Sequence, residues 1–333
     1  MCPDQEMNDA GVQDRVDRVR SGDVRFVSRL IRKLEDGSSR AKTVVKSLYQ
    51  HTGKARIIGM TGAPGAGKST LSDALITCYR QQGKEIGVLA VDPTSPFTGG
   101  AILGDRVRMQ KHAEDPHVYV RSFATRGALG GLADAVDDAV HVLDAMGKDI
   151  ILVETVGIGQ SEVDIMNNAH SVVLVLTPGM GDEVQTIKAG VMEVADLFVI
   201  NKADRPGTAK LYQELNRALD MAPDFPSGWR PPILKVENVV HPKEFLVQVD
   251  EVRTKLEEHF QILVDKEILA ARERRKASVQ FKHSLERSIL KPVLVDLESS
   301  GRLDSLLDKL LDKQTDPASL AEDVADWYRT KQA

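Results

Sequence analysis

A glycine-rich stretch at residues 62–70 carries the residue types that hold a phosphate chain. Its spacing, Gly62-x-x-x-x-Gly67-Lys68-Ser69, is typical of a nucleotide-binding P-loop, in which glycines let backbone N–H groups turn toward phosphate oxygens. Lys68 is expected to reach the β- and γ-phosphates, and Ser69 to supply an oxygen to Mg²⁺. The predicted nucleotide-binding residues of this loop are Gly62, Ala63, Pro64, Gly65, Ala66, Gly67, Lys68, Ser69 and Thr70.

Three acidic residues that come after apolar runs are candidates for holding the Mg²⁺. Asp92 and Asp105 bracket a loop rich in glycine, proline and hydroxyl residues. Each of them either binds Mg²⁺ through its carboxylate or caps a turn or the next helix. Glu154 ends an apolar run and Gly157 follows, which resembles the Walker B and DxxG element with Glu in place of Asp. The alternative for Glu154 is an ordinary acid at the surface end of a strand.

A second nucleotide motif, Asn201-Lys202-Ala203-Asp204, follows another apolar run and matches the NKxD pattern. In that pattern the aspartate accepts hydrogen bonds from both N1–H and N2–H₂ of guanine. Adenine lacks this pair of donors, so it would leave Asp204 without partners. We therefore expect Asn201, Lys202 and Asp204 to select GTP and GDP.

The glycine-containing stretch at residues 178–188, which joins the fifth apolar run to a predicted helix, has no obvious chemistry of its own. Asp182, Gln185 and Lys188 lie there on adjoining turns. By composition this stretch reads as a loop followed by the solvated face of a helix.

Apolar runs alternate with helical patterns through the middle of the chain, which predicts an α/β fold with a doubly wound, mostly parallel sheet. In such a sheet ligands bind beyond the carboxyl ends of the strands, where the motifs above lie. The runs are residues 57–60, 86–91, 118–120, 150–153, 172–176, 197–200 and 233–236.

Helical patterns flank this sheet on both sides and suggest three regions. Residues 1–53 form an N-terminal helical extension, residues 54–260 the nucleotide-binding domain, and residues 261–333 a C-terminal helical arm. The apolar stripe of the arm packs either on a second copy, as a dimerisation surface, or on the nucleotide-binding domain of its own chain.

Composition limits the class of protein. The 333 residues carry a formal net charge of −5, and there is no basic tract, which argues against a nucleic-acid partner. Cys2 and Cys78 make neither a disulfide framework nor a thiolate metal site. Neither a signal peptide nor a membrane-spanning run is present, so we expect a soluble, cytoplasmic protein without a membrane partner.

Together these motifs resemble the MeaB/ArgK family, the G-protein chaperones of adenosylcobalamin-dependent acyl-CoA mutases such as methylmalonyl-CoA mutase. The resemblance covers roughly residues 12–300. It is carried by the P-loop, the NKxD motif and residues 91–95, 98–105, 126–131 and 153–162.

The resemblance implies a P-loop GTPase of the SIMIBI type, a homodimer, that docks on a B12-dependent mutase. Such a protein gates cofactor loading and protects or reactivates the mutase. The resemblance also implies that Lys68 and Ser69 contact phosphate and Mg²⁺, that Asp92, Asp105 and Glu154 complete the metal shell, and that Asp204 binds guanine. Asp182, Gln185 and Lys188 would form a further switch that reports the nucleotide state to the mutase.

One departure from the family pattern affects the base pocket. Val236-Glu237-Asn238 stands where family members usually have a Ser-Ala or Ser-Gly step that supports guanine.

Neither Arg108 nor Arg126 is identified as an arginine finger, since either could form a structural ion pair. We therefore expect slow intrinsic hydrolysis that the partner accelerates.

Alternative functions are a transport-linked P-loop ATPase or kinase, a nickel-insertion metallochaperone GTPase, and a binding module that does not hydrolyse GTP. The first leaves residues 201–204 unexplained. The second needs clustered Cys or His ligands, whereas His112, His117 and His141 have no thiol beside them in the sequence. The third would follow if Glu154 or Asp105 were misplaced.

Overall fold

The computed structural model describes residues 9–92, 112, 114–124, 129–155, 169–179, 195–221, 225, 228–237 and 241–332. The chain divides into two compact units, one ending at Leu269 and the other beginning at Ala270. Both nucleotide motifs of the sequence belong to the first unit. None of the described helices has an apolar stretch of the length that a membrane crossing needs.

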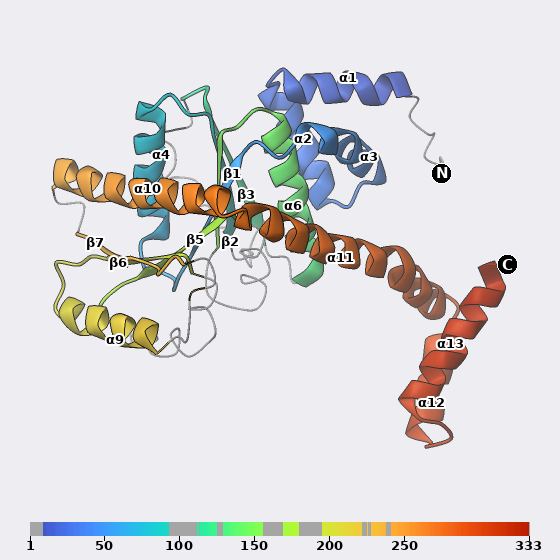
Figure 1. Cartoon of the computed structure of the whole chain (residues 1–333). Helices are drawn as coiled ribbons and strands as arrows, with labels where there is room; N and C mark the ends of the chain where they lie inside the picture. The colour runs from blue at the N-terminus through green and yellow to red at the C-terminus, as the bar shows by residue number, and fades with distance from the viewer. Residues whose placement is uncertain are drawn as a thin grey trace. The chain divides into compact units, whose positions relative to one another are not determined.

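The described part of the first unit is built on a seven-stranded sheet in which every pair of neighbouring strands is parallel (Figure 1). This confirms the predicted doubly wound α/β fold, and each of the seven apolar runs lies in a strand. The strand order is β3-β2-β4-β1-β5-β6-β7. The strands are β1 (Arg56–Thr61), β2 (Ile86–Asp92), β3 (Val118–Ala124), β4 (Ile150–Glu154), β5 (Ser171–Leu176), β6 (Leu197–Asn201) and β7 (Ile233–Val236).

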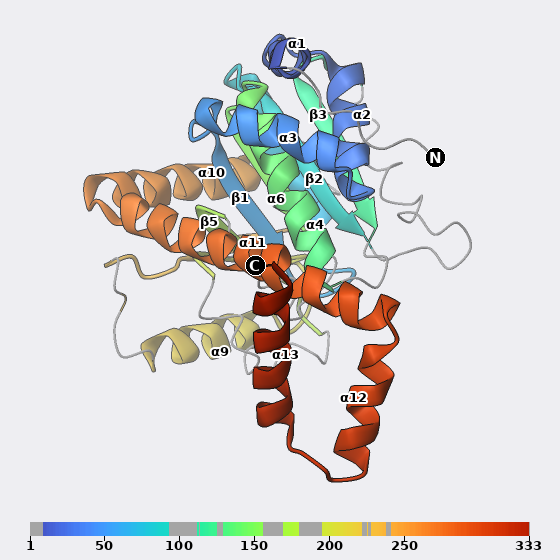
Figure 2. The same ribbon diagram turned by 90° about the vertical axis from the view of Figure 1, so that its right-hand side faces the viewer.

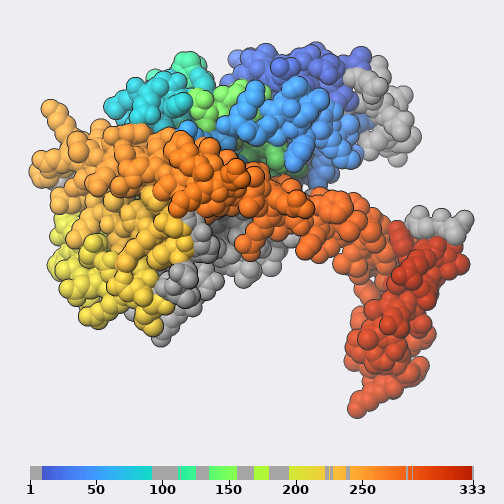
Figure 3. All heavy atoms as spheres, viewed as in Figure 1, coloured from blue at the N-terminus to red at the C-terminus, as the bar shows by residue number. Residues whose placement is uncertain are grey.

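Helices cover both faces of the sheet, which explains why β4, β5 and β6 are buried along their whole length. Helices α4 (Lys68–Gln81) and α10 (Pro242–Asp265) pack together on one face, and their surfaces touch in Figure 3, where α4 is cyan and α10 orange. Helices α6 (Leu129–Ala145) and α9 (Thr208–Asp220) lie on the other face (Figure 2).

The N-terminal helices α1 (Asp9–Arg20), α2 (Val24–Glu35) and α3 (Ser39–Leu48) pack on α6, and a short 3-10 turn, η1 (Tyr49–His51), leads to β1. Helix α2 buries residues spaced at three and four positions, the periodicity of one helix face: Val27, Leu30, Ile31 and Leu34. The N-terminal helical extension is thus present, and its apolar residues join the core formed by α6 and the sheet.

The second unit is helical, as predicted for the C-terminal extension. Helix α11 (Ile268–Ser299) is followed by α12 (Arg302–Leu311) and α13 (Pro317–Gln332). The Asp316 carboxylate accepts hydrogen bonds from the backbone N–H groups of Ala318 and Ser319 at 2.9 and 3.1 Å, which caps the start of α13. Proline at the first helical position suits the same start, because its missing N–H would have no partner there.

Candidate nucleotide-binding site

The P-loop joins the central strand β1 to α4, as its motif requires. Gly67 has a left-handed backbone, with φ of 93°, directly before the first residue of α4. The buried Lys68 ammonium donates hydrogen bonds to the carbonyl oxygens of Gly62 and Ala63 at 2.8 and 3.0 Å. A helix N-terminus and a lysine held across the loop both place positive charge where phosphates bind.

Ser69 and Glu154 meet beside the loop. Strand β4 pairs with β1 so that Glu154 lies opposite Met60, and the Ser69 hydroxyl donates to Glu154 Oε1 at 2.6 Å. Glu154 is only 7% exposed. A hydroxyl and a carboxylate are hard oxygen donors of the kind that Mg²⁺ prefers, so these two residues fit the ion that the P-loop implies.

The NKxD motif contacts the P-loop at the end of β6. The Asn201 amide donates to the Ala66 carbonyl oxygen at 2.8 Å, and the Lys202 ammonium donates to the Gly65 carbonyl oxygen at 2.9 Å. Asp204 is exposed. The order of strands β1, β5 and β6 therefore brings the predicted phosphate and guanine motifs to one edge of the sheet.

The departure at the base pocket is described only in part. Val236 is the buried last residue of β7, and its carbonyl oxygen accepts the Ala203 N–H at 3.0 Å. The Glu237 N–H donates to the Gln248 side chain at 2.8 Å. Asn238 lies outside the described residues. The described link between β7 and the NKxD motif is the backbone hydrogen bond from Ala203 to Val236.

Several predicted site residues fall outside the described ranges. These are Asp105, Asp182, Gln185 and Lys188, together with the two arginines considered for catalysis. Asp92 ends β2, but only its backbone is described. Among the described residues, no group of three His, Cys, Asp or Glu side chains is arranged to hold a metal ion.

Two further residues of the site are not singled out by any motif. The buried Ser72 hydroxyl donates to Glu154 Oε2 at 3.0 Å, and the buried Thr177 hydroxyl donates to the Ala66 carbonyl oxygen at 3.1 Å. Each had a signal in the sequence. Ser72 is one helical turn beyond Ser69, and Thr177 directly follows the fifth apolar run, at the carboxyl end of its strand.

A parallel sheet with a P-loop after its central strand and an NKxD motif two strands away defines a P-loop GTPase. The family model described as "Methylmalonyl Co-A mutase-associated GTPase MeaB" matches residues 27–297. The chain belongs to this family, as the sequence motifs predicted.

Relatives agree with this assignment. A protein of Pyrococcus horikoshii that is named as a GTPase is 46% identical over 317 residues, which are 95% of this chain and 98% of that protein. A Mycobacterium bovis protein, also named as a GTPase, is 42% identical over 228 residues, 66% of this chain and 68% of its own length. The "Methylmalonic aciduria type A homolog, mitochondrial" of Caenorhabditis elegans is 40% identical over 182 residues, 54% of this chain and 46% of that protein.

The fold also matches a solved structure. A crystal structure titled "LAO/AO transport system kinase" aligns with a TM-score of 0.71 at 21% identity, covering 98% of this chain and all of that one. At this identity the match concerns the fold alone, and it confirms the P-loop α/β architecture with helical extensions.

Proposed function

We propose that this GTPase is a chaperone of an adenosylcobalamin-dependent acyl-CoA mutase, which uses GTP binding and hydrolysis to gate cofactor loading and to protect or reactivate the mutase. The observation that carries the proposal is the family match over residues 27–297. The similarity to a protein named for methylmalonic aciduria supports it.

The described residues support a division of work within the site. Lys68 and the N–H groups at the start of α4 bind and orient the β- and γ-phosphates, while Asp204 selects guanine. Ser69 and Glu154 would hold the metal, and Asp92 and Asp105, whose side chains lie outside the described residues, are assigned to it from the sequence alone. When bound, Mg²⁺ neutralises charge that develops on the transferred phosphoryl group.

Communication with the mutase is assigned to Asp182, Gln185 and Lys188. These residues follow β5, and the residue after that strand, Thr177, is hydrogen-bonded to the P-loop at Ala66. Thr177 is therefore a described contact between the P-loop and the strand that precedes this segment.

The test combines the purified chain with a B12-dependent mutase, GTP and adenosylcobalamin. We expect the mutase to raise the GTPase rate, and a GTP-bound chain to change the rate of cofactor transfer into the mutase. A Lys68→Ala variant is the control, because it should lose both effects. Equal GTPase rates with and without a mutase, together with unchanged cofactor transfer, would contradict the proposed chaperone function.

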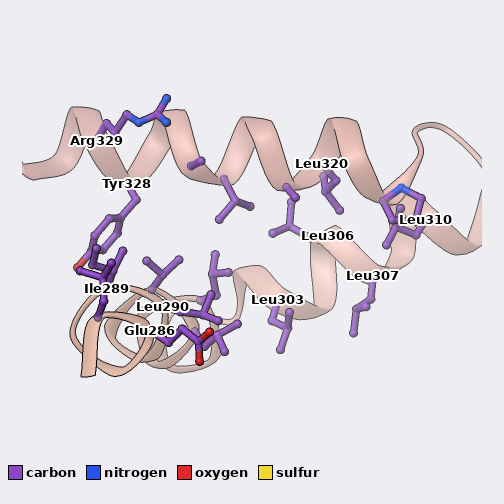
Figure 4. Close-up of a pocket in the computed structure, with 18 of the residues that line it drawn as sticks. Glu286, Ile289, Leu290, Leu303, Leu306, Leu307, Leu310, Leu320, Tyr328 and Arg329 are labelled. Atoms are coloured by element: carbon purple, nitrogen blue, oxygen red, sulfur yellow. The ribbon is translucent and has the colours of Figure 1, made fainter. Parts of the chain in front are cut away.

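The proposal includes a homodimer formed through the second unit. Helices α11, α12 and α13 surround an apolar groove of about 760 Å³, into which leucines of α12 project (Figure 4). Leu290 of α11 and Leu307 of α12 line it and are 53% and 46% exposed. Exposed leucines gathered in one groove are typical of a surface that another protein covers.

The charges at the groove favour a second copy as the occupant. Glu286 lines the groove together with Lys282 and Arg329, so both signs of charge are present on one surface. A two-fold interface brings the same surface of two copies together, and mixed charges allow acid to meet base across it.

Sedimentation velocity tests this part of the proposal. We expect a dimer, and we expect Leu290→Glu to yield a folded monomer. Val295→Glu is the matched control, since Val295 is equally exposed on the same helix but does not line the groove. A monomeric parent chain, or a dimer that survives Leu290→Glu, would contradict this mode of dimerisation.

A further inference from the structure

The carboxylate of Glu154 is held by two hydroxyl groups from adjacent turns of one helix. Ser69 donates to Oε1 at 2.6 Å and Ser72 donates to Oε2 at 3.0 Å. Residues three apart on a helix lie on the same face, so both hydroxyls approach the carboxylate from α4. Ser69 belongs to the P-loop motif and is expected to bind Mg²⁺ as well, whereas Ser72 lies outside the motif.

The Ser72 hydroxyl has one O–H donor and two possible acceptors. Besides Glu154 Oε2, it lies 3.1 Å from the Met60 sulfur. A thioether is a weak acceptor, whereas hydrogen bonds to a carboxylate are shorter and about twice as strong as neutral ones. The Ser72 hydroxyl therefore donates its hydrogen bond to Glu154. Because Ser72 is fully buried, bulk water does not compete for this hydrogen bond.

The two hydrogen bonds would respond differently to a metal ion. Ser69 would supply an oxygen to Mg²⁺ when the ion is bound, so its hydrogen bond to Glu154 would depend on whether the ion is present. Ser72 is fully buried and is not needed as a ligand, so its hydrogen bond to Glu154 Oε2 would persist with the ion bound. Ser72 would then fix the carboxylate of Glu154 while that carboxylate supplies an oxygen to the ion.

We propose that Ser72 is a positioning residue for GTP hydrolysis: it fixes the orientation of the Glu154 carboxylate and thereby sets the affinity of the site for Mg²⁺. This inference rests on the proposed role of Glu154 in the metal shell. Ser72 touches neither nucleotide nor metal, so its effect passes through Glu154.

The test measures release of a fluorescent GDP analogue at a series of Mg²⁺ concentrations, and separately the single-turnover rate of GTP hydrolysis. For Ser72→Ala we expect the Mg²⁺ concentration that half-maximally slows GDP release to rise about tenfold, in line with one lost hydrogen bond to a charged group. GDP affinity without Mg²⁺ should stay within about twofold, since the P-loop contacts remain. Ser72→Thr keeps the hydroxyl, and the flexible Met60 side chain can adjust to the added methyl group, so it should restore the parent behaviour.

Two controls separate positioning from folding. Thr77→Ala removes another α4 hydroxyl, one that donates to the Asp73 carbonyl oxygen rather than to Glu154, and should leave the Mg²⁺ dependence unchanged. In a Glu154→Gln background, Ser72→Ala should have no additional effect, because the group through which it acts is already altered.

Each outcome decides between two explanations. If Glu154→Gln changes the Mg²⁺ dependence and Ser72→Ala does not, the role of Ser72 is overturned while that of Glu154 stands. If Glu154→Gln itself leaves the Mg²⁺ dependence unchanged, the proposed role of Glu154 fails and the inference fails with it. If Ser72→Ala does not fold, Ser72→Cys, which keeps the size with a weak donor, should show the same shift in Mg²⁺ dependence, and an unshifted Ser72→Cys overturns the proposal.

Discussion

The Asn201 amide donates a hydrogen bond to the carbonyl oxygen of Ala66 at 2.8 Å, and so joins the guanine motif to the P-loop. Both residues are buried. In a trans peptide the carbonyl and the following N–H point in opposite directions. Asn201 fixes the direction of the Ala66 carbonyl oxygen. The Gly67 N–H, which belongs to the same peptide group, must therefore point the opposite way.

Gly67→Ala should abolish tight nucleotide binding. A Cβ atom at Gly67 would lie 2.1 Å from the Asn201 amide nitrogen, and the backbone φ of 93° already disfavours a side chain. We expect GDP affinity to fall at least about 100-fold, since both the loop and its contact with Asn201 must move.

Gly83→Ala is the matched control for this prediction. Gly83 also has a positive φ, of 75°, but no atom lies within 4 Å of the place that a Cβ would occupy, so the substitution adds backbone strain without a clash. It should lower stability and leave GDP affinity unchanged. Isothermal titration with GDP, with melting curves for both variants, distinguishes the cases, and equal affinities for the two variants would contradict the argument from Asn201.

Glu154→Gln should separate nucleotide binding from hydrolysis. The amide oxygen can still accept from Ser69, but its NH₂ group cannot accept from Ser72, and the negative charge is lost. At saturating Mg²⁺ we expect GDP affinity within about threefold of the parent and a hydrolysis rate about 100-fold lower. Single-turnover hydrolysis checks this, and a nearly normal rate would show that Glu154 is not required for the reaction.

Local patterns were sufficient to locate the strands and the P-loop. A strand buried on both faces needs a continuous apolar run, and the run at residues 172–176 became β5 with one residue added. Strand β3, at the edge of the sheet, is longer than its apolar run: it pairs with β2 as far as Ala124 and includes Arg121, which forms an ion pair with Glu35 of α2. An edge strand can continue through such a polar position.

Contacts between distant residues could not be predicted in the same way. Ser72 and Glu154 are 82 residues apart, and Asn201 and Ala66 are 135 apart. These pairs depend on which strands are neighbours and on their register, such as Met60 opposite Glu154. No local pattern encodes that register, so the motifs identified residues such as Lys68 and Asn201 but not the contacts of Asn201 with Ala66 and of Ser72 with Glu154.

His259→Ala should destabilise the fold without impairing GTP chemistry. His259 is fully buried, with Nδ1 2.8 Å from the Ser171 hydroxyl and Nε2 3.2 Å from Asp196 Oδ1. The residue types are those of a hydrolase triad, but Ser171 and Asp196 lie at the amino ends of β5 and β6, away from the P-loop edge. We expect the free energy of unfolding to fall by about 3 kcal/mol. Denaturant titration and the GTPase rate of the folded variant check this, and a lost GTPase rate at unchanged stability would contradict it.

The His112–Asp73 pair should make stability depend on pH. His112 Nε2 lies 3.0 Å from Asp73 Oδ1 on α4, and this carboxylate raises the pKa of His112 above its ordinary value, with a smaller contribution from Asp115. A raised pKa means that the folded state binds the proton more tightly than the unfolded state. The stabilisation is therefore complete below the unfolded pKa of about 6.5 and is lost as the pH rises through the folded pKa.

We therefore expect the stability advantage of the parent chain over His112→Gln to shrink between about pH 6 and pH 9, by at most about 1 kcal/mol because the pair is partly solvated. Urea titrations of both proteins across this range measure the difference. Asp73→Asn is the control, because removing the carboxylate should flatten the pH dependence as His112→Gln does. A stability advantage of the parent chain that grows as the pH rises would have the wrong sign for a raised histidine pKa. The His112–Asp73 ion pair would then not be the source of the pH dependence.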